Sequence, residues 1–447
     1  MKKFLAGFLA VAMMAAALAG CSGSGISSSA PAPASALGAS APAADGEELT
    51  GTLKLWTHQN EPWDPTYQAD IEKFTALHPG VTIEMESFPY QDFQSKLQTS
   101  LVSGDGADLY VIFGSWAADY MPTGALSKVP DELAKRMDED FFPSAKGGFT
   151  YDGAYYALPL EYNIEYGAML VNKKLFDEAG LSYPATWEEL ENISDKVSVR
   201  NGELMDMRGL DFVGYDSLPN LFLSMILSTG GQYLEEDGKT LNLTSPEAVA
   251  AMSKLVEYVK DRAWTNLDGI TNYTEGGFSA LFKDRAFMVM SGPWAVATGT
   301  DSYGLQLGTD FDYVALPQYG EENLFAAETG WGFVVPESSK QKDLAWKFLE
   351  FLAEPENLMA HNIACEQIPP CKSVAEDPAY LAAMPYTKPI LDIMANGQYM
   401  GGFNTDLFKG TLGGAFTELA RGTDKYATVE EMLQDVQDTM NAATAKK

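Results

Sequence analysis

Cysteine and histidine are scarce in this sequence, which has three of each among 447 residues. No HExxH motif and no pair of CxxC motifs brings together the ligands that a zinc site needs. The Gly-x-Ser-x-Gly motif of many serine hydrolases is also missing. Gly238-Lys239-Thr240 ends like a phosphate-binding loop, but Tyr233 stands where the earlier glycine is required. We therefore expect no metal and no cofactor.

Basic residues are also few, because 30 Lys and Arg stand against 62 Asp and Glu and give a formal net charge of −32. Such a surface repels phosphate backbones and anionic lipid heads, so nucleic acid is not expected as a partner. Beyond the N-terminal 20 residues no segment reaches the roughly 18 uninterrupted apolar residues of a membrane-spanning helix. Hydrophobic residues still make up 46% of the chain, enough for a large core.

The N-terminus has the three parts of an export signal. Lys2 and Lys3 precede an apolar run over 4–18, and the small residues Ala19-Gly20 follow it. We expect residues 1–20 to be a signal peptide that takes no part in the fold.

The motif Leu18-Ala19-Gly20-Cys21 resembles a bacterial lipobox, which implies cleavage before Cys21 and attachment of lipid to its sulfur. Residues 21–49 are rich in Ser, Ala and Pro and have too few large apolar residues to bury a core, so they indicate a flexible tether. We expect an extracytoplasmic protein that only this lipid anchors to the cell membrane. A long tether of this kind is typical of a Gram-positive cell.

Residues 50–113 alternate between strand and helix patterns. The predicted strands and helices are, in chain order, strand 52–56, helix 67–77, strand 81–86, helix 93–101 and strand 109–113. A β-α-β-α-β order predicts a parallel sheet, and ligands bind beyond the carboxyl ends of its strands. The segments just after the first and third strands, 57–63 and 114–116, are therefore the first places to look for a site.

Further elements follow along the chain. Thr186 and Glu189 form a capping box at a helix start, and Ser245-Pro246-Glu247 begins another helix. Buried strands are predicted at 286–290 and 313–316, and apolar residues repeat at helical spacing over 344–352. The repeated alternation of strands and helices favours two α/β lobes.

Several sequence blocks resemble one known family when they are taken in order. The blocks are 52–56, Phe74-x3-His78-Pro79-Gly80-Val81, 97–109, 151–159, Val171-Asn172-Lys173-Lys174-Leu175-Phe176, Thr186-Trp187-Glu188-Glu189-Leu190, Ser291-Gly292-Pro293-Trp294 and Ala345-Trp346-Lys347-Phe348-Leu349. Their order and spacing resemble the extracellular solute-binding proteins of ABC importers, of the maltose-binding-protein-like, carbohydrate-associated type. Together they cover nearly all of residues 50–370.

The resemblance implies a two-lobed α/β fold of the periplasmic-binding-protein kind, with several hinge crossovers and an interlobe cleft that closes on a ligand. We predict lobe 1 from 50–162 with 316–368, and lobe 2 from 163–315 with 369–447. The implied function is capture of a sugar or oligosaccharide and its delivery to the permease subunits of an ABC importer. We expect a monomer that is not an enzyme.

A sugar site needs aromatic faces for C–H patches, and carboxylates and amides for hydroxyl groups. Trp294 follows a Gly-Pro pair and is the first candidate for stacking. Trp116 follows the third strand together with Ser115, and Trp331 follows Gly330, where the backbone can approach a ligand closely. A place in the core is the alternative for Trp294 and Trp331.

Polar contacts are predicted from three places. The loop after the first strand supplies His58, Asn60 and Glu61. Glu165 matches the place of a cleft glutamate in the maltose-binding pattern, although the spacing also allows Glu161 or Asn163 in that role, and a solvated surface position is the alternative. Asn220 is a candidate from the second lobe.

Cys365 and Cys371 are separated by five residues, and an extracytoplasmic compartment permits oxidation. We predict a disulfide between them, with two free thiols as the alternative.

Three other functions stay open at this point. A glycoside hydrolase needs only two suitably spaced carboxylates. A polyamine or another cationic solute is the alternative cargo, because aromatic faces and acids also bind ammonium groups. A structural or adhesive lipoprotein would show no response to any small ligand.

Overall fold

The computed structural model describes residues 48–60, 63–164, 167–271 and 276–445. Within these ranges the strands form two five-stranded sheets and two small two-stranded sheets. In spatial order the first sheet contains β2 (Gly80–Phe88), β1 (Thr50–His58), β3 (Leu109–Phe113), β13 (Trp331–Val334) and β6 (Ala157–Pro159). The second contains β11 (Phe311–Ala315), β7 (Ala168–Asn172), β10 (Ala286–Met290), β9 (Leu204–Asp211) and β8 (Val199–Asn201).

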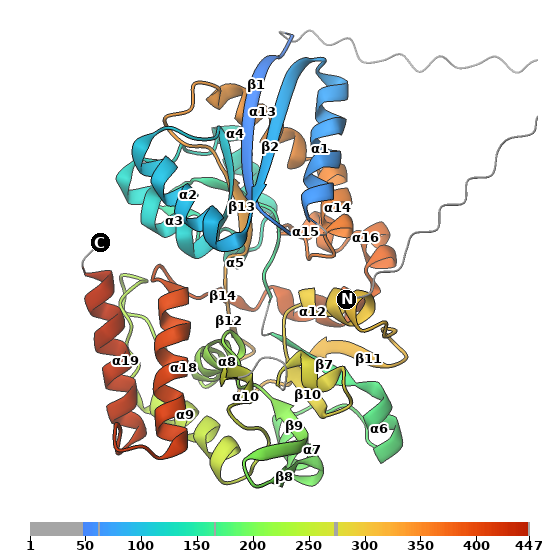
Figure 1. Cartoon of the computed structure of the whole chain (residues 1–447), viewed down its shortest axis with the longest axis vertical. Coiled ribbons are helices and arrows are strands. Elements are labelled where there is room, and N and C mark those ends of the chain that lie inside the picture. The colour runs from blue at the N-terminus through green and yellow to red at the C-terminus, as the bar shows by residue number, and fades with distance from the viewer. Residues whose placement is uncertain (1–47, 61–62, 165–166, 272–275, 446–447) are drawn as a thin grey trace, which may run out of the picture. The chain divides into compact units, whose positions relative to one another are not determined.

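The first sheet begins as the alternating pattern predicts. Strand β1 pairs in parallel with β2, from Thr50 opposite Gly80 onward, and also with β3. Helix α1 (Trp63–Leu77) packs beside β2 (Figure 1). Strand β13 then enters antiparallel between β3 and β6, so the complete sheet is mixed.

The second sheet is also mixed. Strands β9 and β10 are parallel, whereas β7 is antiparallel to β10 and to β11. The small sheets pair β12 (Phe325–Ala327) with β14 (Gly397–Tyr399), and β4 (Thr150–Tyr151) with β5 (Ala154–Tyr155).

Helices surround both sheets, and α18 packs beside α19 (Figure 1). The other helices are α2 (Tyr90–Ser103), α3 (Gly114–Tyr120), α4 (Asp131–Asp140), α5 (Pro143–Gly147), α6 (Lys173–Ala179), α7 (Trp187–Val197), α8 (Ser217–Ser228), α9 (Pro246–Lys260), α10 (Asp268–Thr271), α11 (Phe278–Leu281), α12 (Trp294–Ala297), α13 (Lys342–Leu352), α14 (Pro355–Ala364), α15 (Lys372–Ala375), α16 (Pro378–Ala383), α17 (Leu391–Met394), α18 (Thr405–Arg421) and α19 (Val429–Thr444). Short turns η1 (Met121–Thr123), η2 (Thr298–Ser302) and η3 (Pro385–Ile390) complete the set.

The predicted helix caps are present. The Thr186 side chain accepts a hydrogen bond from the Glu189 N–H, and the Glu189 carboxylate accepts one from the Ala185 N–H. Ser245 caps α9 by accepting from the Ala248 N–H. These bonds satisfy N–H groups that the first turn of a helix leaves without partners.

Separate apolar cores lie on the two large sheets. Leu55, Val111 and Phe333 belong to the first core, while Leu210 and Met288 belong to the second. The fold is therefore the two-lobed α/β arrangement that was predicted. In the described part of the chain, no helix has the length and apolar character to cross a bilayer.

The boundaries of the lobes stay a prediction. Cys371 and Val374, which that prediction gives to lobe 2, pack in the core of the first sheet.

Candidate functional site

A cavity of about 390 Å³ lies among elements of both lobes. Its walls combine aromatic rings with amides and carboxylates, and are formed by Asn60, Trp63, Phe113, Glu161, Asn163, Pro293, Trp294, Ala297, Thr298, Asp301, Ser302, Trp331, Cys365 and Gln367. We call it the cleft cavity. Its size is in the range of small-molecule sites in proteins.

Trp331 is the centre of the aromatic wall on the first lobe. It is the first residue of β13, so its backbone is held opposite Phe113 at the carboxyl end of β3. The ring of His58 stacks on it at 4.3 Å between centroids, and the ring of Trp63 meets it edge-on at 5.9 Å. These neighbours fix the orientation of the Trp331 ring while leaving it only partly buried.

Trp294 supplies an aromatic surface from the second lobe. Strand β10 ends at Met290, and Ser291-Gly292-Pro293 leads directly into α12, whose first residue is Trp294. The ring is partly buried and meets Phe278 edge-on at 5.3 Å. Gly-Pro thus ends the strand and places a tryptophan at the cavity, as the motif predicts.

Glu161 is the buried carboxylate of the cleft cavity. Its side chain accepts a hydrogen bond of 3.0 Å from the Trp331 N–H and is 6% exposed. Burial raises the pKa of Glu161 to about 7, although the Trp331 N–H and the nearby His361 oppose this rise. A Cβ atom at Gly330 would lie 2.4 Å from Glu161 Oε1, so any larger residue there would displace this carboxylate from its present position.

A second cavity, of about 460 Å³, lies next to Trp116. The Trp116 indole N–H donates to Asp406 Oδ2 at 3.1 Å, which joins α3 to α18. The Trp116 ring also meets Trp331 edge-on at 5.4 Å. Ser115 lines the same second cavity.

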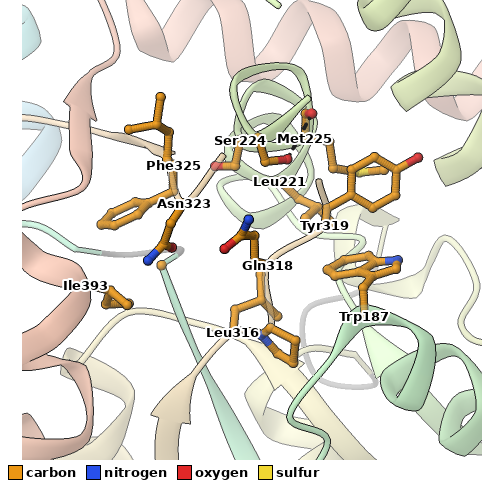
Figure 2. A pocket seen from close by; sticks show the side chains of 14 residues that line it. Trp187, Leu221, Ser224, Met225, Leu316, Gln318, Tyr319, Asn323, Phe325 and Ile393 are labelled. Atoms are coloured by element: carbon orange, nitrogen blue, oxygen red, sulfur yellow. Dashed lines mark hydrogen bonds between the residues drawn. The ribbon is translucent and has the colours of Figure 1, made fainter. Parts of the chain in front are cut away.

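Figure 2 shows a smaller pocket beside β12 and α8. Its volume is about 40 Å³, which holds a few water molecules but no sugar ring. Trp187 and Tyr319 form one side of it, with their rings edge-on at 5.2 Å, and the labelled side chains include no carboxylate. The cleft cavity is therefore a better candidate for the functional site than this pocket.

Comparison with known proteins identifies the family. The family model described as "Bacterial extracellular solute-binding protein" matches residues 69–385. The chain belongs to this family. A maltotriose-binding protein of Pyrococcus abyssi is 25% identical over 336 residues, which cover 74% of this chain and 68% of that protein. A lactose-binding protein of Rhizobium radiobacter is 28% identical over 331 residues, with 70% and 73% covered.

Solved structures of binding proteins share the fold. The cyclic α-maltosyl-1,6-maltose binding protein of Arthrobacter globiformis gives a TM-score of 0.72 at 20% identity, with 89% of this chain and 100% of that chain covered. An ABC substrate-binding protein of Listeria monocytogenes in complex with cycloalternan gives 0.70 at 19% identity, with 89% and 99% covered.

The structure brings several of the predicted residues of this solute-binding protein together. Trp294, Trp331 and Asn60 line the cleft cavity, and Gly330 packs against its carboxylate. Of the alternatives to Glu165, both Glu161 and Asn163 line it. Glu61, Glu165 and Cys21 lie outside the described residues.

Other predicted residues lie elsewhere. His58 sits behind Trp331, where burial lowers its pKa to about 4 and keeps its ring neutral. Trp116 and Ser115 face the second cavity. Asn220 is not among the residues that line the cleft cavity: it is 1% exposed inside α8, and its Nδ2 donates to the Asp216 carbonyl one turn earlier.

The predicted disulfide is absent, because Cys365 and Cys371 are both free thiols. Cys365 lines the cleft cavity, whereas Cys371 lines a different pocket beside Arg136 and Asp140. The turn between α14 and α15 thus directs the two sulfurs into different surroundings. Sequence spacing alone does not show this, since a disulfide depends on the directions of the two Cβ atoms.

Sequence reasoning missed other members of the cavity. Phe113 is the last residue of β3, and Trp63 begins α1 at the end of the segment 57–63 where a site was expected, but neither was singled out. Asp301, Ser302 and Gln367 lie in short turns that carry no motif.

The raised pKa of Glu161 predicts a pH-dependent stability. A carboxyl group with a higher pKa in the folded state stabilises the fold fully below about pH 4.5 and loses this contribution as the pH rises through about 7. The side chain of the Glu161→Gln variant is neutral at every pH. Relative to this variant, the free energy of unfolding of the wild type should fall by up to roughly 3 kcal/mol between about pH 4.5 and about pH 7. Urea unfolding of both proteins at about pH 5 and about pH 8 measures the difference. Parallel pH profiles would contradict it.

Proposed function

We propose that this solute-binding protein captures a sugar or an oligosaccharide in the cleft cavity and delivers it to an ABC importer. The observation that carries the proposal is the composition of the cavity. Partly buried indole rings, Trp294 from one lobe and Trp331 from the other, lie around the buried Glu161 carboxylate. Rings can cover the C–H faces of a sugar, while the carboxylate accepts from its hydroxyl groups.

Amide groups complete this chemistry. Asn60, Asn163 and Gln367 can donate and accept hydrogen bonds around the ring of a sugar. The named relatives bind maltotriose and lactose, which supports a carbohydrate ligand. They are binding proteins by name, which also supports a role without catalysis.

Lobe closure is the proposed mechanism of capture. Because the cavity has walls from both lobes, a ligand that contacts both favours the closed state by its differential affinity. The permease would then recognise the closed, loaded form. We further propose that lipid on Cys21 and the tether over 21–49 keep a monomeric, mobile protein close to the importer, on the outer side of the cell membrane.

A cationic solute is the second candidate, and one feature favours it. Glu161 and Asp301 are carboxylates beside tryptophan faces, and this combination also binds ammonium groups. The Glu161 pKa of about 7 works against this candidate, because near neutral pH the group carries only part of a full negative charge and attracts a cation less strongly than an ordinary carboxylate does.

A thermal-shift panel of monosaccharides, oligosaccharides and polyamines tests the function. A ligand that binds only the folded state raises the melting temperature, so we expect at least one sugar to raise it. The same sugar should reduce the radius of gyration in small-angle scattering if the lobes close. A rise with polyamines alone would overturn the sugar assignment, and binding at an unchanged radius would overturn closure.

A further inference from the structure

A thiol, an imidazole and a carboxylate lie in a row behind the wall of the cleft cavity. Cys365 caps the C-terminus of α14, and its Sγ lies 3.7 Å from Nε2 of His361, one turn earlier. His361 Nδ1 lies 2.7 Å from Asp70 Oδ2 on α1. All three residues are buried. The imidazole is therefore held between two groups that can both accept a proton from it.

The position of His361 favours its charged form. Burial alone would lower the pKa of His361, but the Cys365 sulfur and the Asp70 carboxylate together raise it to about 10. Asp70 and Cys365 then act as acceptors on the two ring nitrogens. A thiol in contact with an imidazole can pass its proton to the ring, which produces the nucleophilic thiolate.

Unpaired polar atoms lie beside the sulfur. Cys365 also lines a narrow crevice behind the cleft cavity, together with Tyr67, Asn362, His361 and Glu161. Within the described chain, the Tyr67 hydroxyl and Asn362 Oδ1 are buried and have no hydrogen-bond partner. Burial, and then the nearby Cys365, raise the pKa of Tyr67 well above its ordinary value, so its hydroxyl stays a donor. A donor hydroxyl and an acceptor amide oxygen, both without partners, thus line the same crevice as the sulfur.

Cys371 provides the contrast within the same chain. Its sulfur accepts from Ser373 Oγ at 3.8 Å, and no histidine lines its pocket among the described residues. Burial raises its pKa to about 12, which keeps it a thiol. The two free cysteines thus differ in the groups that surround them.

We propose that Cys365 is a redox-sensitive thiol, and that its oxidation by a peroxide controls occupation of the cleft cavity. The Cys365 thiolate attacks one peroxide oxygen, the S–O bond forms and the O–O bond breaks. The leaving hydroxide takes the proton of the His361 imidazolium and departs as water, which leaves a sulfenic acid and a neutral imidazole. Sulfur is oxidised and the peroxide is reduced. The effect on the ligand rests on the proposed sugar-binding function, because Cys365 is part of the cavity wall.

Alkylation measures the thiolate without any sugar. In the full chain with Cys21→Ser and Cys371→Ser, Cys365 is the only thiol. We expect Cys365 in this chain to react with iodoacetamide at about pH 7 about tenfold faster than it does in the His361→Gln variant, because the imidazole at 3.7 Å can take the proton of the thiol. Equal rates in the two proteins would overturn the proposal. If the His361→Gln variant unfolds, the Asp70→Asn variant takes its place. An unchanged alkylation rate of Cys365 in that variant would also overturn the proposal.

Hydrogen peroxide, followed by dimedone labelling, tests the oxidation itself. We expect the label on Cys365, and none on the chain with Cys21→Ser and Cys365→Ser, which keeps only Cys371. The sugar identified by thermal shift should lose at least about tenfold in affinity after oxidation, and dithiothreitol should restore it. Equal affinity before and after oxidation, measured on a sample without dimedone, would overturn the control of the cavity. A protein that takes the label after oxidation but binds no sugar in its untreated, reduced form would instead contradict the proposed function and leave the reactive thiol standing.

Discussion

Replacing Trp294 by alanine should weaken sugar binding about 10- to 100-fold, because an aromatic platform in a binding site contributes roughly 1–3 kcal/mol. Trp294 begins α12 at the edge of the cleft cavity and is only partly buried, so its removal exposes little of the core. We therefore expect the melting temperature of the ligand-free protein to change little. Isothermal titration with the sugar identified by thermal shift measures the affinity.

Two variants control this experiment. Trp294→Phe keeps a smaller aromatic face and should retain part of the affinity. Trp346→Phe changes a tryptophan that is 5% exposed in α13 and donates to Ser127 Oγ, away from the cavity. That variant should lower the melting temperature and leave the affinity unchanged. If Trp294→Ala binds the sugar as tightly as wild type does, Trp294 has no place in the site.

Local signals account for the parts of the fold that the sequence predicts correctly. Strands β3 and β10 have the predicted bounds, because a short apolar run between turn residues leaves little choice of where the strand begins and ends. Thr186 and Ser245 cap their helices as predicted, since a cap depends on residues within one turn. The two-lobed α/β fold follows from the order of these elements and from the family resemblance.

Features that depend on contacts between distant segments cannot be predicted from local sequence patterns. Strand β13 lies far along the chain from β3, and only the folded sheet shows that it enters antiparallel and sets Trp331 against Phe113. The burial of Asn220 is a further example, because a polar residue in an apolar helix can bond to the backbone of its own helix and stay buried.

The residues that line the cleft cavity show the same division between local and distant effects. Trp294 was predicted from a Gly-Pro turn, which is a local signal. Glu161 was only an alternative to Glu165, since its burial depends on the backbone of Trp331 and on the absence of a side chain at Gly330. Asp301 reaches the cavity from a turn without a motif, and no sequence signal could have selected it.

Replacing Lys409 by methionine should lower the free energy of unfolding by about 3–5 kcal/mol, because it leaves the buried Glu328 carboxylate without its cation. Lys409 Nζ lies 2.6 Å from Glu328 Oε2 and 2.7 Å from Asp216 Oδ1, and its side chain is 4% exposed. Glu328 follows β12 on the connection to β13, so this ion pair ties the connection between two sheets to α18. Urea unfolding measures the loss.

Glu328, the buried partner of Lys409, provides the decisive control. Burial raises the pKa of Glu328 and Lys409 opposes this, so removal of Lys409 should leave Glu328 to take up a proton as the pH falls. The Lys409→Met variant should therefore recover part of its stability in acid, and the double variant with Glu328→Gln should recover part of it at neutral pH. Lys425→Met, which removes an exposed lysine 3.8 Å from Asp435, should have no measurable effect. Equal losses in the single and double variants would show that Lys409 stabilises the fold by packing of its aliphatic stem and not by its charge.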